Sequence, residues 1–359
     1  MKVQSVELKY FKKLRNLSHD DLDFTNPETG LARDLILLVG KNGSGKTSIL
    51  QAIAATLGVA TGRLKSLTAL DWMGYNYELL SNNWGRFEPG VNLQVQFSKA
   101  EIEAIKEFYS KLLEMGRNLP ISPAESYLVS LKWNWNAERV LADTDAQFFQ
   151  FKGREYAKQL LRSEGFQVFE RVGSVFWYTE QRTSTSLTTE DASQTLEITN
   201  DILRDRLSKW RQFHQDLGPG GRIKELRPGQ KDLYAEIERT YQAVFPERNF
   251  SGPVPREEIA DILSEPWFYL YDGKNEYEIS ERSGGERAVF SILRDFANFN
   301  IHNSVILIDE IELHLHPPMQ QALLRALPKL GNNNQFIITT HSDYVEQLVP
   351  DAYIVRLEV

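Results

Sequence analysis

The sequence predicts an α/β fold, a layered mixed sheet with an inserted, mostly helical region. Residues 35–39 form a continuous apolar run typical of a strand buried on both faces, and apolar residues then recur at helical spacing over 49–57. We expect this helix to end at Gly58, because glycine often ends helices. The order of a strand followed by a helix returns near the C-terminus, where an apolar run at 305–308 is followed by a helical pattern and a second strand at 336–338.

The segment between about residues 99 and 265 has a different character. Its helical patterns cover residues 100–115, 155–162, 196–214 and 230–245. We therefore expect residues 1–98 and 266–359 to form one domain, with 99–265 as the inserted, mostly helical region.

Composition excludes several classes of protein. The chain has 49 acidic and 41 basic residues, and its net charge of −8 argues against a protein that coats nucleic acid through bulk charge. Cysteine is absent, which excludes disulfides, thiolate zinc sites and cysteine nucleophiles, and makes the reducing cytoplasm the expected location. Charges interrupt the apolar positions of the first residues, so we expect no signal peptide, and no apolar stretch reaches membrane-spanning length.

A glycine-rich motif follows the first buried strand. Residues 40–47 read GKNGSGKT and match G-x-x-x-x-G-K-[ST], a loop whose backbone N–H groups surround phosphate oxygens. Lys46 would reach the β- and γ-phosphates, and Thr47 would bring its hydroxyl to Mg²⁺. The flanking strand and helix disfavour a merely flexible glycine turn, so the motif predicts that ATP and Mg²⁺ bind here. The residues expected to bind the nucleotide are Gly40, Asn42, Gly43, Ser44, Gly45, Lys46, Thr47 and Ser48.

Two adjacent carboxylates follow the strand at 305–308. Asp309 would belong to the Mg²⁺ shell, while Glu310 would orient or deprotonate the water that attacks the γ-phosphate. The alternative, a solvated acidic turn, loses weight because a phosphate loop is present in the same chain.

A second glycine pair opens a helical pattern at Ser283, Gly284 and Gly285. Such a helix start presents a serine hydroxyl and free backbone N–H groups to an anion. Taken alone the signal is weak, because a turn next to the hairpin expected at 268–279 would also explain it.

The order of these motifs, with His341 after the last strand, resembles the ATP-binding cassette (ABC) ATPases, which are P-loop NTPases. The resemblance implies that Ser283 and Gly285 complete the ATP site of a second subunit, so we expect a homodimer of ATP-sandwiched heads. It also implies catalytic roles for Lys46, Glu310 and His341. A histidine held by ordinary hydrogen bonds is the alternative for His341.

Two segments indicate the branch of this family. Residues 3–14 and the run DEIELHLHP at 309–317 resemble the RecF and overcoming-lysogenisation-defect (OLD) ATPases. The distance from Lys46 to Ser283 exceeds what a transporter cassette needs and is too short for the arms of structural-maintenance-of-chromosomes (SMC) proteins. The sequence departs from the family at Arg282, where transporters favour leucine.

The resemblance also bears on partners. Few residues follow His341, so we expect this chain to lack the metal-dependent nuclease domain of OLD proteins. The chain also resembles the PtuA-like ATPases of two-component anti-phage systems, and this resemblance implies a separate effector such as a nuclease. We therefore expect an ATPase that acts as a dimerisation switch, in a dimer or higher oligomer. The alternatives are a non-hydrolysing ATP-bound scaffold, a transporter cassette and a P-loop kinase.

Three further patterns leave alternatives open. Gln181, after a strand at 175–178, is the candidate for the glutamine that senses Mg²⁺, and an ordinary loop residue is the alternative. Glu312, His314 and His316 fit a connecting segment better than a metal site. Eight basic residues against three acidic ones lie between 204 and 231, which favours a solvated helix face or an acidic partner, with DNA contact as the alternative.

Overall fold

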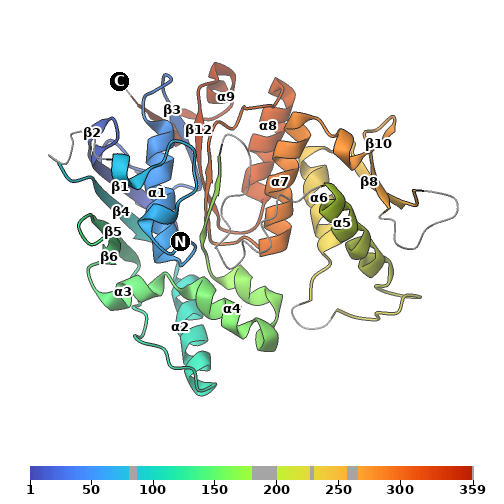
Figure 1. The fold of residues 1–359 in the computed structure, drawn as a ribbon, viewed down its shortest axis with the longest axis horizontal. Helices are drawn as coiled ribbons and strands as arrows, with labels where there is room; N and C mark the ends of the chain where they lie inside the picture. The colour runs from blue at the N-terminus through green and yellow to red at the C-terminus, as the bar shows by residue number, and fades with distance from the viewer. Residues whose placement is uncertain (81–86, 180–199, 227–229, 257–265, 358–359) are drawn as a thin grey trace.

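The computed structural model describes residues 1–80, 87–179, 200–226, 230–256 and 266–357 (Figure 1). Within these ranges five parallel strands form a central sheet, in the order β13-β3-β12-β11-β7. They are β3 (Leu35–Val39), β7 (Val175–Tyr178), β11 (Val305–Ile308), β12 (Gln335–Thr340) and β13 (Ile354–Arg356). The prediction of an α/β fold is confirmed.

Antiparallel strands form two further sheets in the described chain, so the parallel and antiparallel strands are segregated. The first sheet has the order β2-β1-β4-β5-β6, with β1 (Lys2–Phe11), β2 (Leu14–Leu17), β4 (Gly90–Gln96), β5 (Leu128–Asn134) and β6 (Arg139–Ala142). The second has the order β10-β9-β8, with β8 (Asn249–Val254), β9 (Trp267–Tyr271) and β10 (Glu276–Glu278).

The central sheet is buried on both faces because its side chains alternate between two hydrophobic clusters. One cluster includes Ile36, Leu38, Leu307 and Ile337, and the other includes Leu37, Ile306, Ile308 and Ile338. This two-sided burial explains why the central strands have continuous apolar sequences.

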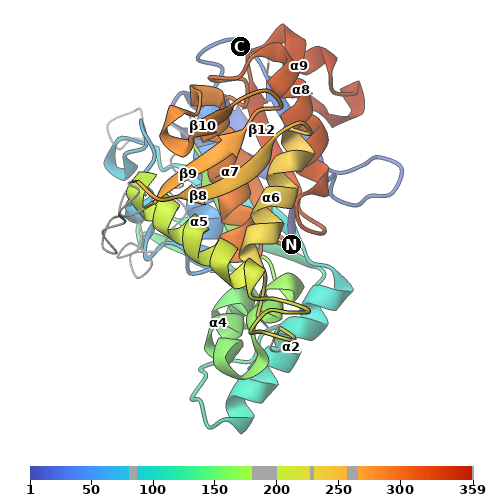
Figure 2. The same ribbon diagram turned by 90° about the vertical axis from the view of Figure 1, so that its right-hand side faces the viewer.

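Helices cover both faces of the central sheet. The helix α1 (Lys46–Ala60) lies in the first cluster, between the central sheet and the antiparallel sheet of β1 (Figure 1). The helices α6 (Leu233–Val244), α7 (Gly284–Phe299) and α8 (Pro317–Ala326) belong to the second cluster. Figure 2 shows α5 (Asn200–Gln215) and the small sheet of β8 and β9 on the outer side of α7.

The helix α1 continues past Gly58, so the predicted end of this helix is wrong. Gly58 lies inside the helix, and a Cβ there would be 2.6 Å from Cδ1 of Leu64. The helix ends at Ala60, and Gly62 follows with φ +76°. The glycine at 58 therefore permits close packing, while Gly62 provides the left-handed turn.

The range 99–265 contains helices where the helical patterns predict them, in its described residues. The predicted helices are α2 (Lys99–Glu114), α4 (Gly153–Glu164), α5 and α6, while the short helix α3 (Asp145–Gln150) lies outside the predicted patterns. The same range also supplies β7, which the sequence analysis predicted, and β5, β6 and β8, which it did not. Three of these strands pair outside the range: β5 with β4, β7 with β11, and β8 with β9. The range is therefore interwoven with the flanking segments, and the proposed division into head and insertion stays a prediction.

The remaining helix relevant to the site is α9 (Asp343–Gln347), which follows β12. None of the described helices combines the length and the apolar character needed to cross a membrane.

The packing of α1 between two sheets predicts a large cost for a cavity there. Leu57 is 0% exposed, so Leu57→Ala should lower the free energy of unfolding by about 2–5 kcal/mol. Leu113 on α2 is 46% exposed, and Leu113→Ala should change it by about 0.5 kcal/mol or less. Urea unfolding followed by circular dichroism measures both, and equal shifts would contradict the layer assignment of α1.

Candidate nucleotide-binding site

The predicted phosphate loop joins the carboxyl end of β3 to the first turn of α1. Gly43 and Gly45 have φ of +83° and +97°, a region that residues with a Cβ rarely adopt. A Cβ at Gly45 would also lie 2.5 Å from Cδ2 of Leu14, the first residue of β2. Glycine is therefore required here, and the N-terminal hairpin supports the loop from outside.

The phosphate loop surrounds the buried ammonium group of Lys46. Lys46 is 6% exposed, and its Nζ donates to the backbone oxygens of Gly40 at 2.6 Å and Lys41 at 3.2 Å. In the described part of the chain, Oγ of Ser44 is buried without a hydrogen-bond partner. Phosphate oxygens are held in proteins by such groups: the ammonium of Lys46, the unused hydroxyl of Ser44 and the N-terminal end of the 15-residue helix α1. These residues therefore fit a nucleoside triphosphate.

Residues far apart in the sequence meet where β3 and β11 end. The hydroxyl of Thr47 donates to Oδ1 of Asp309 at 3.2 Å, and Thr339 on β12 donates to the same oxygen at 2.6 Å. Asp309 is 2% exposed. A hydroxyl beside a buried carboxylate is the oxygen ligand set that Mg²⁺ prefers, so the pair fits the predicted metal.

The second carboxylate lies beside the predicted histidine. Glu310 has φ +46°, and its N–H donates to Oγ1 of Thr339 at 2.8 Å. Nδ1 of His341 lies 3.7 Å from Oε1 of Glu310 and 2.9 Å from Oε1 of Glu312. The structure therefore brings Glu310 and His341 together, and it adds Glu312, which the sequence analysis weighed only as a weak metal ligand.

The second glycine pair does open a helix. Ser283 is the N-cap of α7, where its hydroxyl accepts from the N–H of Glu286 and its own N–H donates to the Glu286 carboxylate. Ser283 and Gly284 are exposed, whereas Gly285 packs on the backbone of His314. The helices α7 and α1 cover opposite faces of the central sheet, as Figure 1 shows on either side of β12. Ser283 thus begins a helix on the opposite face of the sheet from the helix that follows the phosphate loop.

Arg282 replaces the leucine of the family pattern without facing outward. It is 7% exposed, its Nε donates to the backbone oxygen of Ile279 at 2.6 Å, and its guanidinium lies 4.6 Å from the ring centre of Phe290. Burial lowers the pKa of Arg282 to about 10. The side chain of Arg282 is therefore held inside the protein by the packing of its aliphatic part and by its hydrogen bond to Ile279.

The sequence analysis missed the residues that anchor Glu286. Its Oε1 accepts from the hydroxyl of Tyr277 at 2.6 Å and of Tyr241 at 3.3 Å, and it forms an ion pair with Arg248. The spacing of Ser283 and Glu286 is that of a capping box, and this pattern could have identified Glu286 from the sequence. The partners of Glu286 come from α6, from the small sheet and from the residue just before β8, so the local sequence could not identify them.

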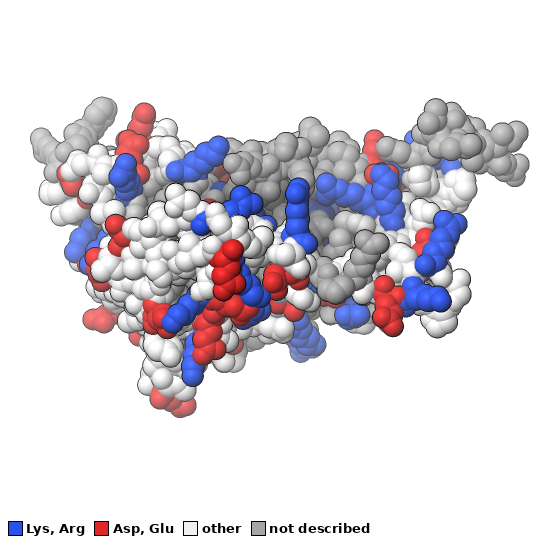
Figure 3. Space-filling view, turned by 90° about the horizontal axis from the view of Figure 1, so that it is seen from below, with Lys and Arg blue, Asp and Glu red and all other residues white. Residues whose placement is uncertain are grey.

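Two predicted features have other outcomes. Gln181 lies outside the described residues. In the basic segment 204–231, Arg204 is paired with Glu278 at 2.8 Å and Lys209 with Asp205 at 2.7 Å. Figure 3 shows acidic side chains interspersed with the basic ones on the face seen from below. The choice between a solvated helix face, an acidic partner and DNA contact therefore stays a prediction.

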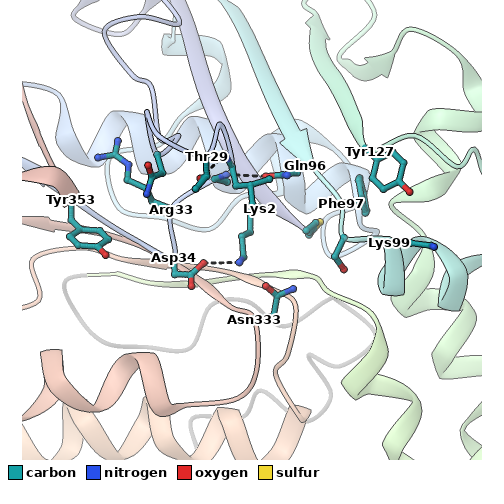
Figure 4. Close-up of a pocket in the computed structure, with 15 residues that line it drawn as sticks. Lys2, Thr29, Arg33, Asp34, Gln96, Phe97, Lys99, Tyr127, Asn333 and Tyr353 are labelled. Carbon is teal, nitrogen blue, oxygen red and sulfur yellow. Dashed lines mark hydrogen bonds and ion pairs between the residues drawn. The ribbon is translucent and has the colours of Figure 1, made fainter.

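A pocket of about 580 Å³ lies at the opposite edge of the central sheet (Figure 4). Its lining includes Lys2, Asp34 and Asn333, which precede or begin β1, β3 and β12, and the Lys2–Asp34 ion pair measures 2.6 Å. None of the predicted site residues lines this pocket. The candidate nucleotide site is instead the loop at the carboxyl ends of the strands, where α/β sheets bind ligands.

A phosphate loop, a Thr47–Asp309 pair and a capped glycine helix start define an ABC/AAA ATPase of the RecF/SMC-like branch. The chain belongs to the AAA ATPase domain family, whose model matches residues 1–113 and 174–345. The unmatched residues between these ranges hold β5, β6, α3 and α4. The chain is thus an ATPase-type nucleotide-binding protein.

Relatives and a solved structure agree with this class. The chain is 24% identical over 399 aligned positions to "Retron Ec83 probable ATPase" of Escherichia coli, covering 96% of this chain and 69% of that protein. It is 23% identical to "Retron Vc95 probable ATPase" of Vibrio cholerae serotype O1 biovar El Tor, covering 95% and 73%. The SmcHead bound to the C-winged helix domain of ScpA is similar in fold, with a TM-score of 0.51, 15% identity, and coverage of 97% of this chain and 92% of that one.

The packing at the start of α7 predicts that its two glycines differ. A Cβ at Gly285 would lie 2.6 Å from the backbone oxygen of His314, whereas at Gly284 the nearest atom would be 3.7 Å away. Gly285→Ala should therefore lower the free energy of unfolding by about 1–3 kcal/mol. Gly284→Ala should change it by about 0.5 kcal/mol or less. Thermal unfolding of the two variants compares them, and equal midpoints would show that α7 does not pack on His314 in this way.

Proposed function

We propose that this protein hydrolyses ATP to ADP and phosphate, and that ATP binding and hydrolysis switch it between a closed homodimer and separate subunits. The observation that carries the proposal is the convergence of Lys46, Thr47, Asp309, Glu310 and His341 at one edge of the central sheet.

The proposed roles follow from the positions of these groups. Lys46 and the loop N–H groups bind the β- and γ-phosphates, and Thr47 with Asp309 holds Mg²⁺. The bound ion would neutralise charge on the phosphates. Glu310, whose side chain is 27% exposed, accepts a proton from the attacking water, and His341 donates a hydrogen bond to the γ-phosphate. Gln181 remains a proposed further contact to the metal.

The location of Ser283 supports a dimer. Ser283 and Gly284 are exposed at the N-terminus of the 16-residue helix α7, which has a positive dipole end, and α7 packs on the opposite face of the central sheet from α1. A second copy in the reverse orientation would bring this helix start to the γ-phosphate. Each ATP would then be bound by two subunits, which couples nucleotide state to association.

The relatives support a setting for this switch. Two of them are named as ATPases of retrons, and the sequence resembles the ATPases of two-component anti-phage systems. We place the protein in anti-phage defence in the cytoplasm, with a separate effector such as a nuclease and with DNA as a further candidate partner. An ATP-bound scaffold that holds the effector without hydrolysis is the second candidate.

Glu310→Gln tests the switch. The amide keeps the shape of the side chain but cannot accept the proton of water, so phosphate release should fall about 100-fold or more while ATP binding persists. The variant should therefore accumulate as a dimer in Mg-ATP, measured by light scattering after size exclusion. Glu114→Gln, at the exposed end of α2, is the matched control and should behave as wild type.

Two outcomes separate the candidates. Monomers at micromolar concentration for both wild type and Glu310→Gln would rule out the homodimer switch. ATP binding and dimerisation without any phosphate release from wild type would favour the scaffold.

A further inference from the structure

Glu312 is a buried carboxylate that the proposed chemistry does not use. It is 9% exposed and lies two residues after Glu310. Its Oε2 accepts from the hydroxyl of Thr340 at 2.8 Å, and its Oε1 accepts from the backbone N–H of His341 at 2.8 Å. The same Oε1 lies 2.9 Å from Nδ1 of the His341 ring. A single carboxylate thus contacts both the backbone and the ring of His341.

This contact has a consequence for the proton on the ring. An ionised carboxylate has no proton to donate, so its negative charge 2.9 Å from Nδ1 favours the ring form that carries a proton on this nitrogen. The second nitrogen, Nε2, then points away from Glu312 in a side chain that is 44% exposed. A ring with protons on both nitrogens can donate from Nε2 to an anion while its Nδ1 proton faces the Glu312 carboxylate.

We propose that Glu312 is a positioning residue that holds His341 with its proton on Nδ1 and directs Nε2 to the γ-phosphate. This inference rests on the proposed function of His341. Among the described residues, the charged groups that face the ring are Glu310 and Glu312, with carboxylate oxygens 3.7 Å and 2.9 Å from Nδ1.

The backbone around Glu312 is held tightly enough for this role. The N–H of Ile311 donates to the oxygen of Thr339 at 3.2 Å, and the N–H of Glu310 donates to the Thr339 hydroxyl. Two residues of the segment, Glu310 and His314, have φ of +46° and +64°. Non-glycine residues adopt this region only when surrounding contacts enforce it, so the position of Glu312 is determined by the end of β12.

A purely structural contact is the competing explanation, in which Glu312 only satisfies the N–H of His341. The variant Glu312→Gln distinguishes the two. Its amide oxygen can still accept from the N–H of His341, and its NH₂ group can donate to the Thr340 hydroxyl. The substitution therefore keeps the contacts to the His341 N–H and the Thr340 hydroxyl, but it removes the negative charge beside Nδ1 and so weakens the preference for a proton on this nitrogen.

The test reads the ring directly, by ¹⁵N NMR of histidine-labelled full-length protein, with His341→Ala to assign the signal. Wild type should show the proton on Nδ1, and Glu312→Gln should shift the population towards the proton on Nε2. The wild-type spectrum alone tests the proposal if the variant does not fold, because an unprotonated Nδ1 in wild type would overturn it.

Kinetics provide the second measurement. We expect Glu312→Gln to lower kcat for phosphate release about 10-fold or more, with KM for ATP within about twofold of wild type. Glu346→Gln is the matched control, since Glu346 on α9 pairs with Arg356 at 2.8 Å, and it should leave both constants unchanged.

The outcomes are distinguishable from failure of the proposed function. An unchanged ring signal in Glu312→Gln, or an unchanged kcat while Glu310→Gln is inactive, overturns the role of Glu312. If Glu310→Gln releases phosphate as fast as wild type, the proposed role of Glu310 in hydrolysis fails, and the ring spectrum still decides whether Glu312 sets the proton position.

Discussion

The parallel pairing of β12 with β3 on one side and β11 on the other is the constraint on which the site depends. In this register Thr340 lies opposite Val39, and Ile338 lies opposite Ile308. The phosphate loop, the two carboxylates and the histidine therefore leave the sheet at one edge. Thr339 then connects them, because its hydroxyl donates to Asp309 and accepts from the N–H of Glu310. The candidate site residues are therefore brought together at the ends of the strands, not around a cavity.

The segment after β11 connects this edge to the start of α7. It begins at Glu310, contacts His341 through Glu312, and reaches His314, whose backbone packs on Gly285. Its two left-handed residues show that packing, not local preference, determines its course. Groups proposed to act on a bound nucleotide and the helix start proposed to act on a partner's nucleotide thus belong to one continuous structure.

The start of α7 is also supported from its other side. Glu286 caps the helix with one oxygen and accepts from two tyrosines with the other, while Arg248 balances its charge. A buried carboxylate needs such partners, since removing them would leave an unpaired charge. Residues of α6 and of the small sheet therefore hold the glycine helix start, which gives part of the range 99–265 a structural role in the site.

Local sequence was sufficient to identify the α/β class, the strand at 35–39, the phosphate loop and the carboxylate pair, because each depends on neighbouring residues and on burial of whole strands. The sequence did not reveal that Gly58 lies within α1, that residues 128–134 and 139–142 form strands, or that Glu312 contacts His341 and Arg248 contacts Glu286. Those features depend on Leu64, β4, His341 and Glu286, which are separated from them in sequence or face them only in the fold. The sequence thus determined which chemical groups are present, and the tertiary structure decided which of them meet, because hydrogen bonds and packing act through space.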